Sequence, residues 1–230
     1  MDLVFDETAV DQPLVQRVWW STCEATTGFA SAVKTSSMLA FARSPEGVTS
    51  VHLRGPEQSS AVVMCEEGWE FFGVEFRLGV YLPQFPPSAL VDRQDALLPI
   101  LPGDRIVLDN REWEMPTAQN VDVFVSRLAR AGLLLLDPLV DDIQHGERPR
   151  GMSVRIAQLR FRRAVGLSHR KVSSIEQARK AAALLAAGGS IADAVIGGGY
   201  YDHPHLARAM RWATGQTPSE LRSRISFLAL

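Results

Sequence analysis

The side chains best suited to chemistry lie in a short C-terminal segment, between Ser190 and Arg222. Within it, Asp202 is a favourable N-cap, and the apolar spacing after it predicts a helix that buries Leu206 and Met210. The opposite side of this helix then carries groups that donate hydrogen bonds to phosphate oxygens or base edges. These outward residues are His203, His205, Arg208 and Arg211.

Another helix is predicted directly before this one. Ser190 can cap it with Asp193 at the third helical position, which is the capping-box spacing, and the glycines from 197 to 199 end it. Two helices joined by a tight glycine turn have the geometry that places the second helix in the DNA major groove. Each extra helical glycine costs roughly 1 kcal/mol against alanine, so weak or conditional DNA binding is one expectation.

A further basic helix is predicted between a Ser153 N-cap and Gly166. Its expected inward residues are Ile156, Leu159 or Ala157, Phe161 and Val165, and its exposed stripe holds Arg155, Gln158 and Arg162. The next helix is expected from 175 to 187, with Ser174 as N-cap and Gln177 completing the capping box.

Charge divides the sequence into two parts. Residues 150–230 hold 13 Lys and Arg against four acidic residues, a balance of +9, and the remainder holds 11 against 22, a balance of −11. An acidic first part joined to a basic last part is expected when one domain meets phosphate and the other does not. The alternative is a basic surface that is merely solvated.

Before residue 120 the apolar period is two. The expected strands are 38–43, 48–54, 60–65 and 70–78, separated by turn signals, and residues 1–16 are expected to form a loose acidic leader. In the last run Phe72, Val74, Phe76 and Leu78 should be buried, with Gly73, Glu75 and Arg77 in water. These strands predict a small sandwich or barrel. From Asn120 a helical period begins, and Asp137 is expected to cap a short helix up to Gln144.

Several C-terminal motifs resemble one family. The segment GYYDHPHLARAMRWATGQTPSELR, preceded by LLAAGGSIADAV, resembles the signature of AraC/XylS-type transcription regulators, in which Thr217 and Pro218 open a last helix. The segment SVRIAQLRFRRAVGLS is similar to the family's first recognition helix. The earlier segments RGPE, GVEFRLGVYLPQFP and DVFVSRLARAGLLLLDP are similar to the sensor domain of a subgroup. The sequence departs from the family in its triple glycine and in the short segment GERPRG, which leaves little room for a helix supporting the first recognition helix.

The resemblance implies two recognition helices joined by a long helix. Base contacts then fall to Arg155 and Gln158 in the first unit and to His203, His205 and Arg208 in the second. Arginine suits guanine and glutamine suits adenine. The residues assigned to phosphates are Arg162, Arg163, Arg170, Lys171 and Arg211. Two simpler roles stay open, because Arg155 and Arg162 could be a solvated face and His205 could pack against Tyr200.

Many aromatic residues in the first part suggest a pocket for an apolar or aromatic effector, although strand aromatics are often plain core. The candidate pocket residues are Trp69, Phe72, Phe76 and Trp113.

Other functional classes find no support in the sequence. No catalytic motif, phosphate-binding loop, cofactor motif or metal-ligand cluster is present, and Asp202, His203 and His205 do not share one helix face. No apolar run reaches the length of a membrane span, and no signal peptide is evident. Cys23 and Cys65 lack metal-type spacing, so reduced thiols in a cytoplasmic protein are expected, with a disulfide as the alternative.

Taken together, the sequence predicts an α+β protein. A β-rich sensor or dimerisation domain (1–120), a helical linker (121–149) and an all-α double helix-turn-helix domain (150–230) are expected. The predicted function is sequence-specific transcription regulation, with double-stranded DNA, a small effector, RNA polymerase and a second copy of the chain as candidate partners. The rival functions are a protein-interaction adaptor with a degenerate helix-turn-helix and a small-molecule enzyme built on the β-rich domain.

Overall fold

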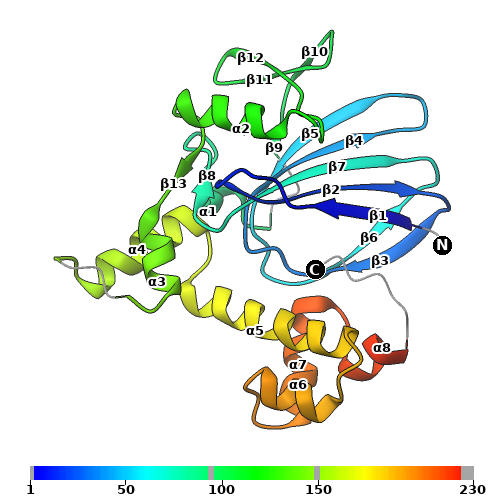
Figure 1. Ribbon diagram of the computed structural model, residues 1–230, viewed down its shortest axis with the longest axis vertical. Helices are drawn as coiled ribbons and strands as arrows, with labels where there is room; N and C mark the ends of the chain where they lie inside the picture. The colour runs from blue at the N-terminus through cyan, green and yellow to red at the C-terminus, as the bar shows by residue number, and fades with distance from the viewer. Residues whose placement is uncertain (1–2, 93–95, 148–150, 224–230) are drawn as a thin grey trace. The chain divides into compact units, whose positions relative to one another are not determined.

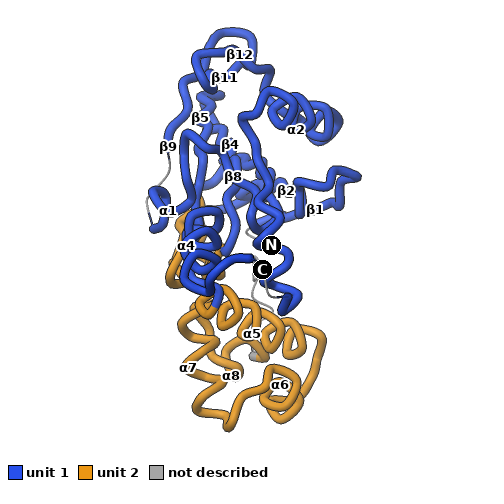
Figure 2. The backbone as a smooth tube through the Cα atoms, turned by 90° about the vertical axis from the view of Figure 1, so that its left-hand side faces the viewer, with its two compact units in different colours: residues 1–26, 35–56, 66–169 blue, residues 27–34, 57–65, 170–230 orange. Residues whose placement is uncertain are grey.

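The computed structural model describes residues 3–92, 96–147 and 151–223, which divide into two compact units (Figure 2). Unit 1 takes in residues 1–26, 35–56 and 66–169, and unit 2 takes in 27–34, 57–65 and 170–230. The predicted domain borders follow composition along the chain, whereas the compact units follow packing. Two early segments therefore belong with the C-terminal helices, and the first basic helix belongs with the β-rich part.

A six-stranded antiparallel sheet forms the centre of unit 1 (Figure 1). The strands predicted at 38–43 and 48–54 are confirmed with one residue of difference. The loose acidic leader is wrong, because residues 3–8 pair with the next strand along their whole length and bury Leu3. In sheet order the strands are β1 (Leu3–Thr8), β2 (Val15–Cys23), β7 (Glu70–Phe76), β4 (Met38–Arg43), β5 (Thr49–Arg54) and β9 (Ala96–Leu97).

One face of this sheet packs against a second layer. Val18, Leu39 and Val74 line up across neighbouring strands and are fully buried there. Trp113 joins the same core and donates its indole N–H to the carbonyl of Leu108. The elements of this layer and its connections are β8 (Val80–Tyr81), α1 (Pro87–Leu90), β10 (Ile100–Leu101), β11 (Arg105–Leu108), β12 (Arg111–Glu114), α2 (Val121–Arg130) and β13 (Leu135–Leu136).

Two residues that were predicted to lie in water on β7, Gly73 and Glu75, are buried. The Glu75 side chain is fully buried, although its position in the pattern predicted contact with water. Arg17 Nε on β2 donates to the Glu75 carboxylate at 2.7 Å, and Ser36 Oγ donates to it at 3.0 Å. A buried carboxylate is tolerated when a cation and further donors satisfy it, and Arg17 on β2 and Ser36 before β4 supply them here.

Both cysteines are disulfide-bonded, so the expectation of reduced thiols is wrong. Cys23 ends β2, Cys65 ends the strand at 61–65, and both are buried. The disulfide that the sequence left open as the alternative is therefore the state in the structure.

Two more helices complete unit 1, α3 (Pro138–Gln144) and α4 (Val154–Val165). The predicted caps are confirmed, since Asp137 accepts from the amide of Leu139 and Ser153 accepts from that of Ile156. The buried side of α4 contacts α1, α3 and β8. This packing, rather than its basic composition, places α4 in unit 1.

Unit 2 is mostly helical. Its helices share one hydrophobic core, which includes Leu185, Leu206 and Met210. The helix predicted from 175 begins at His169 instead, and Ser174 is an internal residue that donates to the carbonyl of Arg170. The elements of unit 2 are β3 (Thr27–Ser31) paired with β6 (Ala61–Cys65), α5 (His169–Ala186), α6 (Ile191–Gly197), α7 (His203–Thr214) and α8 (Pro218–Ser223). No helix among the described residues is long and apolar enough to cross a membrane.

Candidate nucleic-acid interface

The turn between α6 and α7 has the predicted geometry. Ser190 and Asp193 form the complete capping box of α6, and their hydrogen bonds lower the pKa of the Asp193 carboxyl. Gly199 adopts a φ of +67°, and a side chain on Gly198 would collide with the ring of Tyr200. Only Gly197 lies inside the helix. The helical cost expected for the triple glycine therefore applies to one residue, because the other two form the turn.

Gln177 on α5 fixes this turn from outside. Its side-chain amide donates to the carbonyls of Gly198, at 2.5 Å, and of Gly199, at 3.3 Å. These carbonyls follow the end of α6, where backbone acceptors lack partners within the helix. The sequence pattern assigned Gln177 to a capping box instead, and only tertiary packing reveals its role.

The two faces of α7 are confirmed as predicted. Asp202 caps the helix by accepting from the amide of His205, and Leu206 and Met210 are fully buried. The four outward residues His203, His205, Arg208 and Arg211 are all exposed.

The ring of His205 meets the ring of Tyr200 edge to face, with centroids 5.1 Å apart. The alternative role left open for His205, a local structural contact, is therefore present. His203 and Arg208 form no ion pair with any residue in the described part of the chain. They are the α7 side chains most available to a ligand.

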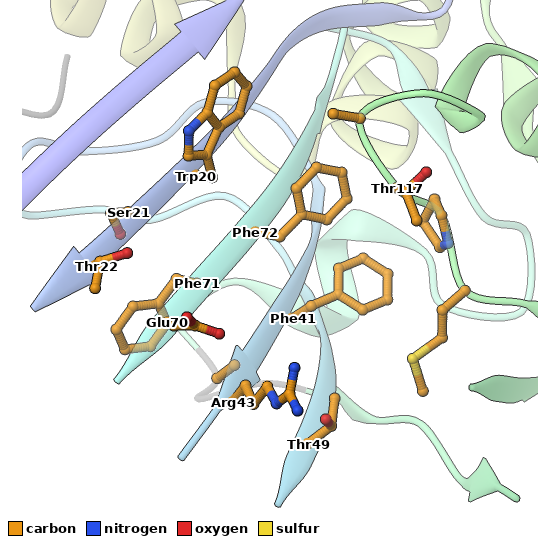
Figure 3. Close-up of a pocket in the computed structure, with 14 residues that line it drawn as sticks. Trp20, Ser21, Thr22, Phe41, Arg43, Thr49, Glu70, Phe71, Phe72 and Thr117 are labelled. Atoms are coloured by element: carbon orange, nitrogen blue, oxygen red, sulfur yellow. The ribbon is translucent and has the colours of Figure 1, made fainter. Parts of the chain in front are cut away.

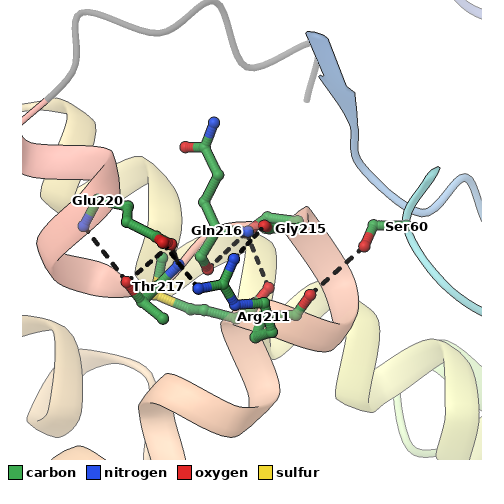
Figure 4. A network of polar contacts seen from close by, with 8 residues as sticks. Ser60, Arg211, Gly215, Gln216, Thr217 and Glu220 are labelled. Carbon is green, nitrogen blue, oxygen red and sulfur yellow. Dashed lines mark hydrogen bonds and ion pairs between the residues drawn. The ribbon is translucent and has the colours of Figure 1, made fainter. Parts of the chain in front are cut away.

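Arg211 is held at the corner between α7 and α8 (Figure 4). It donates to the carbonyl of Gly215 at 3.0 Å and to the carboxylate of Glu220 at 2.8 Å. Glu220 also accepts from the amide and hydroxyl of Thr217, which completes the capping box predicted for α8. The Thr217 amide, Arg211 and the Thr217 hydroxyl together lower the pKa of Glu220 to about 2. A phosphate contact by Arg211 would have to compete with this carboxylate.

The last turn of α7 is capped by residues that flank the strands β3 and β6, a contact that the sequence did not predict. The carbonyls of Trp212 and Ala213 accept from the amides of Ser60 and Val33, at 3.1 and 2.8 Å. The Trp212 indole N–H donates to the carbonyl of Gln58 at 2.7 Å. Helix C-terminal carbonyls need partners from outside the helix, and residues much earlier in the chain supply them here.

The two remaining candidates in unit 2 differ in their surroundings. Lys171 is half-buried, with its ammonium 4.1 Å from the centroid of the Trp212 ring. This cation–π contact favours a structural role. Arg170 is exposed and keeps its assignment as a phosphate ligand.

On α4 the four predicted DNA contacts share an exposed face with apolar residues. Arg155, Gln158, Arg162 and Arg163 are all exposed, and none pairs with an acidic side chain in the described ranges. Ile156 and Leu159 are 55% and 61% exposed, so placing Ile156 in the core is wrong and Ala157 occupies the inward position. Ala164 is also buried on the inward side of α4, and its side chain is too small to stand out in the apolar pattern of the sequence.

Arg160 is the α4 arginine that the sequence did not single out. It donates to Asp137 at 2.8 Å, and this hydrogen bond and charge raise the pKa of its guanidinium. Asp137 therefore caps α3 and also anchors α4.

A cavity of about 410 Å³ lies on the core-facing side of the unit 1 sheet (Figure 3). Of the four predicted pocket residues, Phe72 lines it. Phe76 and Trp113 are core residues, and Trp69 stacks on Phe71 with centroids 6.1 Å apart. Aromatic composition alone could not separate core from cavity wall. The main lining residues that it missed are Trp20, Phe41, Arg43, Glu70 and the segment from Met115 to Ala118.

No family model matches the chain, and no curated protein matches it. Among solved structures, the apo ToxT K231A protein from Vibrio cholerae strain SCE256 is similar at a TM-score of 0.39 and 10% identity, over 97% of both chains. A likeness at this level carries no argument about fold or function.

Proposed function

We propose that the chain is a sequence-specific, DNA-binding transcription regulator in which α7 enters the major groove. The observation that carries the proposal is the outward face of α7, where His203 and Arg208 are exposed and available. The N-terminus of this helix is fixed by the Asp202 cap and by the turn that Gln177 holds. A helix fixed in this way presents its first turns to base edges without further ordering.

The second support is the surface of α4. Arg155 and Gln158 suit guanine and adenine edges, and Arg162 and Arg163 suit phosphates. All four are exposed on one helix. The resemblance of both helices to AraC/XylS-type recognition helices agrees with these roles.

Binding should first be tested with the full-length chain by selecting bound fragments from a random DNA pool. We expect a recovered motif, and an affinity that falls steeply as salt rises because phosphate contacts release counterions. A slope near zero in log K against log salt would contradict DNA binding.

Point variants then separate the two classes of contact. Arg208→Ala should weaken binding to the selected site by about 1–3 kcal/mol and relax preference at one base position. Arg162→Ala should weaken binding to all sequences alike and reduce the salt slope by about one. Lys180→Ala is the matched control, since this exposed cation on α5 has no assigned role. If Arg208→Ala binds like Lys180→Ala, the assigned face of α7 is wrong.

A specific observation also favours a protein-interaction role for α4. Ile156 and Leu159 are 55% and 61% exposed and lie three residues apart on one helix face, and neighbouring exposed apolar side chains are typical of protein contacts. In that case Leu159→Ala would abolish partner capture while leaving DNA affinity and its salt slope unchanged.

A further inference from the structure

The cavity in unit 1 has an apolar row on its floor. Trp20, Phe72 and Phe41 are register partners on the adjacent strands β2, β7 and β4. The Phe41 and Phe72 rings lie 5.6 Å apart at 46°, and both face the segment that carries Thr117 (Figure 3). Such a row accepts a flat apolar group.

The next row of the same face is polar and carries both charges. Two residues further along the strands, Thr22, Glu70, Arg43 and Thr49 are again register neighbours. Two residues of strand span about 7 Å, so the character of the wall changes within a short molecule's length. Arg43 and Glu70 form no ion pair with each other or with another side chain among the described residues. They are therefore available as a matched cation and anion.

The opposite wall of the cavity is the loop from Met115 to Ala118, which a hydrogen bond fixes in place. Met115 and Pro116 supply its apolar surface, and the amide of Thr117 donates to Asn120 Oδ1 at 2.7 Å. Asn120 stands directly before α2, so the loop is tied to a helix that packs in the core. A wall fixed in this way reduces the cost of ordering on binding.

We propose that this cavity binds a small aromatic zwitterion of the amino-acid type. The ring lies on Trp20, Phe72 and Phe41, the carboxylate meets Arg43, and the ammonium meets Glu70. A ligand with a carboxylate alone would face the negative charge of Glu70, and one with an amine alone would face Arg43. Only a zwitterion pairs both charges at once.

This inference deepens the effector part of the proposed function, and it is tested without DNA. Its failure and a failure of DNA binding are therefore separate results. The probes are L-phenylalanine, 3-phenylpropionate and 2-phenylethylamine, titrated calorimetrically into the full-length protein. L-Phenylalanine should bind at least about fivefold more tightly than either single-charge probe, as expected for one added charged hydrogen bond.

Two variants assign the charges. Arg43→Gln should weaken L-phenylalanine and 3-phenylpropionate by about fivefold, and it should not weaken 2-phenylethylamine. Glu70→Gln should weaken L-phenylalanine and 2-phenylethylamine, and it should strengthen 3-phenylpropionate because the repulsion is removed. Arg77→Gln and Glu147→Gln are matched controls on exposed residues outside the cavity lining.

Three results would overturn the proposal. In the first, none of the three probes binds the parent protein. In the second, the parent protein binds all three with equal affinity. In the third, Arg43→Gln and Glu70→Gln bind the probes as their control variants do.

Discussion

At the scale of single residues, Glu220 has two structural roles, of which the sequence predicted only the capping of the last helix. It completes the N-terminal cap of α8 and also holds Arg211, which was assigned to phosphate. The same carboxylate therefore stabilises the corner between two helices and competes with any anion for the guanidinium of Arg211. Removing the Glu220 carboxylate should free Arg211 and should also destabilise the junction between α7 and α8.

Glu220 also predicts a pH dependence of stability. Its folded-state pKa of about 2 lies below its ordinary value of 4.5, mainly because the Thr217 amide and Arg211 bond its charged form. A lowered pKa contributes stability that is complete above pH 4.5 and is lost as the pH falls towards 2. In urea titrations, parent protein and Glu220→Gln should differ at neutral pH and converge over this window. Curves that stay parallel down to pH 2 would contradict the assignment.

At the scale of elements, the last turn of α7 depends on backbone donors from Val33 and Ser60, which lie next to β3 and β6. Trp212→Phe keeps most of the ring and removes the donor to Gln58, so it should destabilise unit 2 by about 0.5–1.5 kcal/mol. Hydrogen exchange should show faster exchange in α7. Trp113→Phe removes a comparable indole donor in unit 1 and should leave α7 unchanged. Equal exchange of α7 in both variants would show that this contact does not hold the helix.

Elements governed by local chemistry were predictable from the sequence. The caps Ser153, Ser190 and Asp202 and the strand at 38–43 follow from short-range pattern and are confirmed. What escaped prediction needs a partner distant in the chain. The burial of Glu75 depends on Arg17, and the role of Gln177 depends on the α6–α7 turn.

The same distinction holds within the candidate site. The outward face of α7 follows from helical period alone, whereas the engagement of Arg211 and of Lys171 follows from α8 and from Trp212. The cavity wall was largely missed because strand alternation predicts which face of the sheet a side chain lies on. It does not show where a neighbouring loop leaves space above that face.

At the scale of the whole molecule, each compact unit is built from separate stretches of chain. A fragment cut at the predicted border, residues 150–230, would lack Val33 and Ser60, whose amides cap α7. We expect this fragment to melt at a lower temperature than the full-length protein and its α7 amides to exchange faster, since two backbone hydrogen bonds are lost. Equal protection of α7 in fragment and full-length chain would show that the last turn does not need these two donors.

The residues that cap α7 are synthesised long before the helix itself. Gln58 leaves the ribosome 154 residues before Trp212, its hydrogen-bond partner. At bacterial or eukaryotic elongation speeds this is an interval of roughly ten to thirty seconds. Throughout this interval the backbone groups beside the β3–β6 strand pair, among them the amides of Val33 and Ser60, lack the helix that they will bond. The last turn of α7 can therefore form its outside hydrogen bonds as soon as it is synthesised, because the partners from the earlier chain are already present.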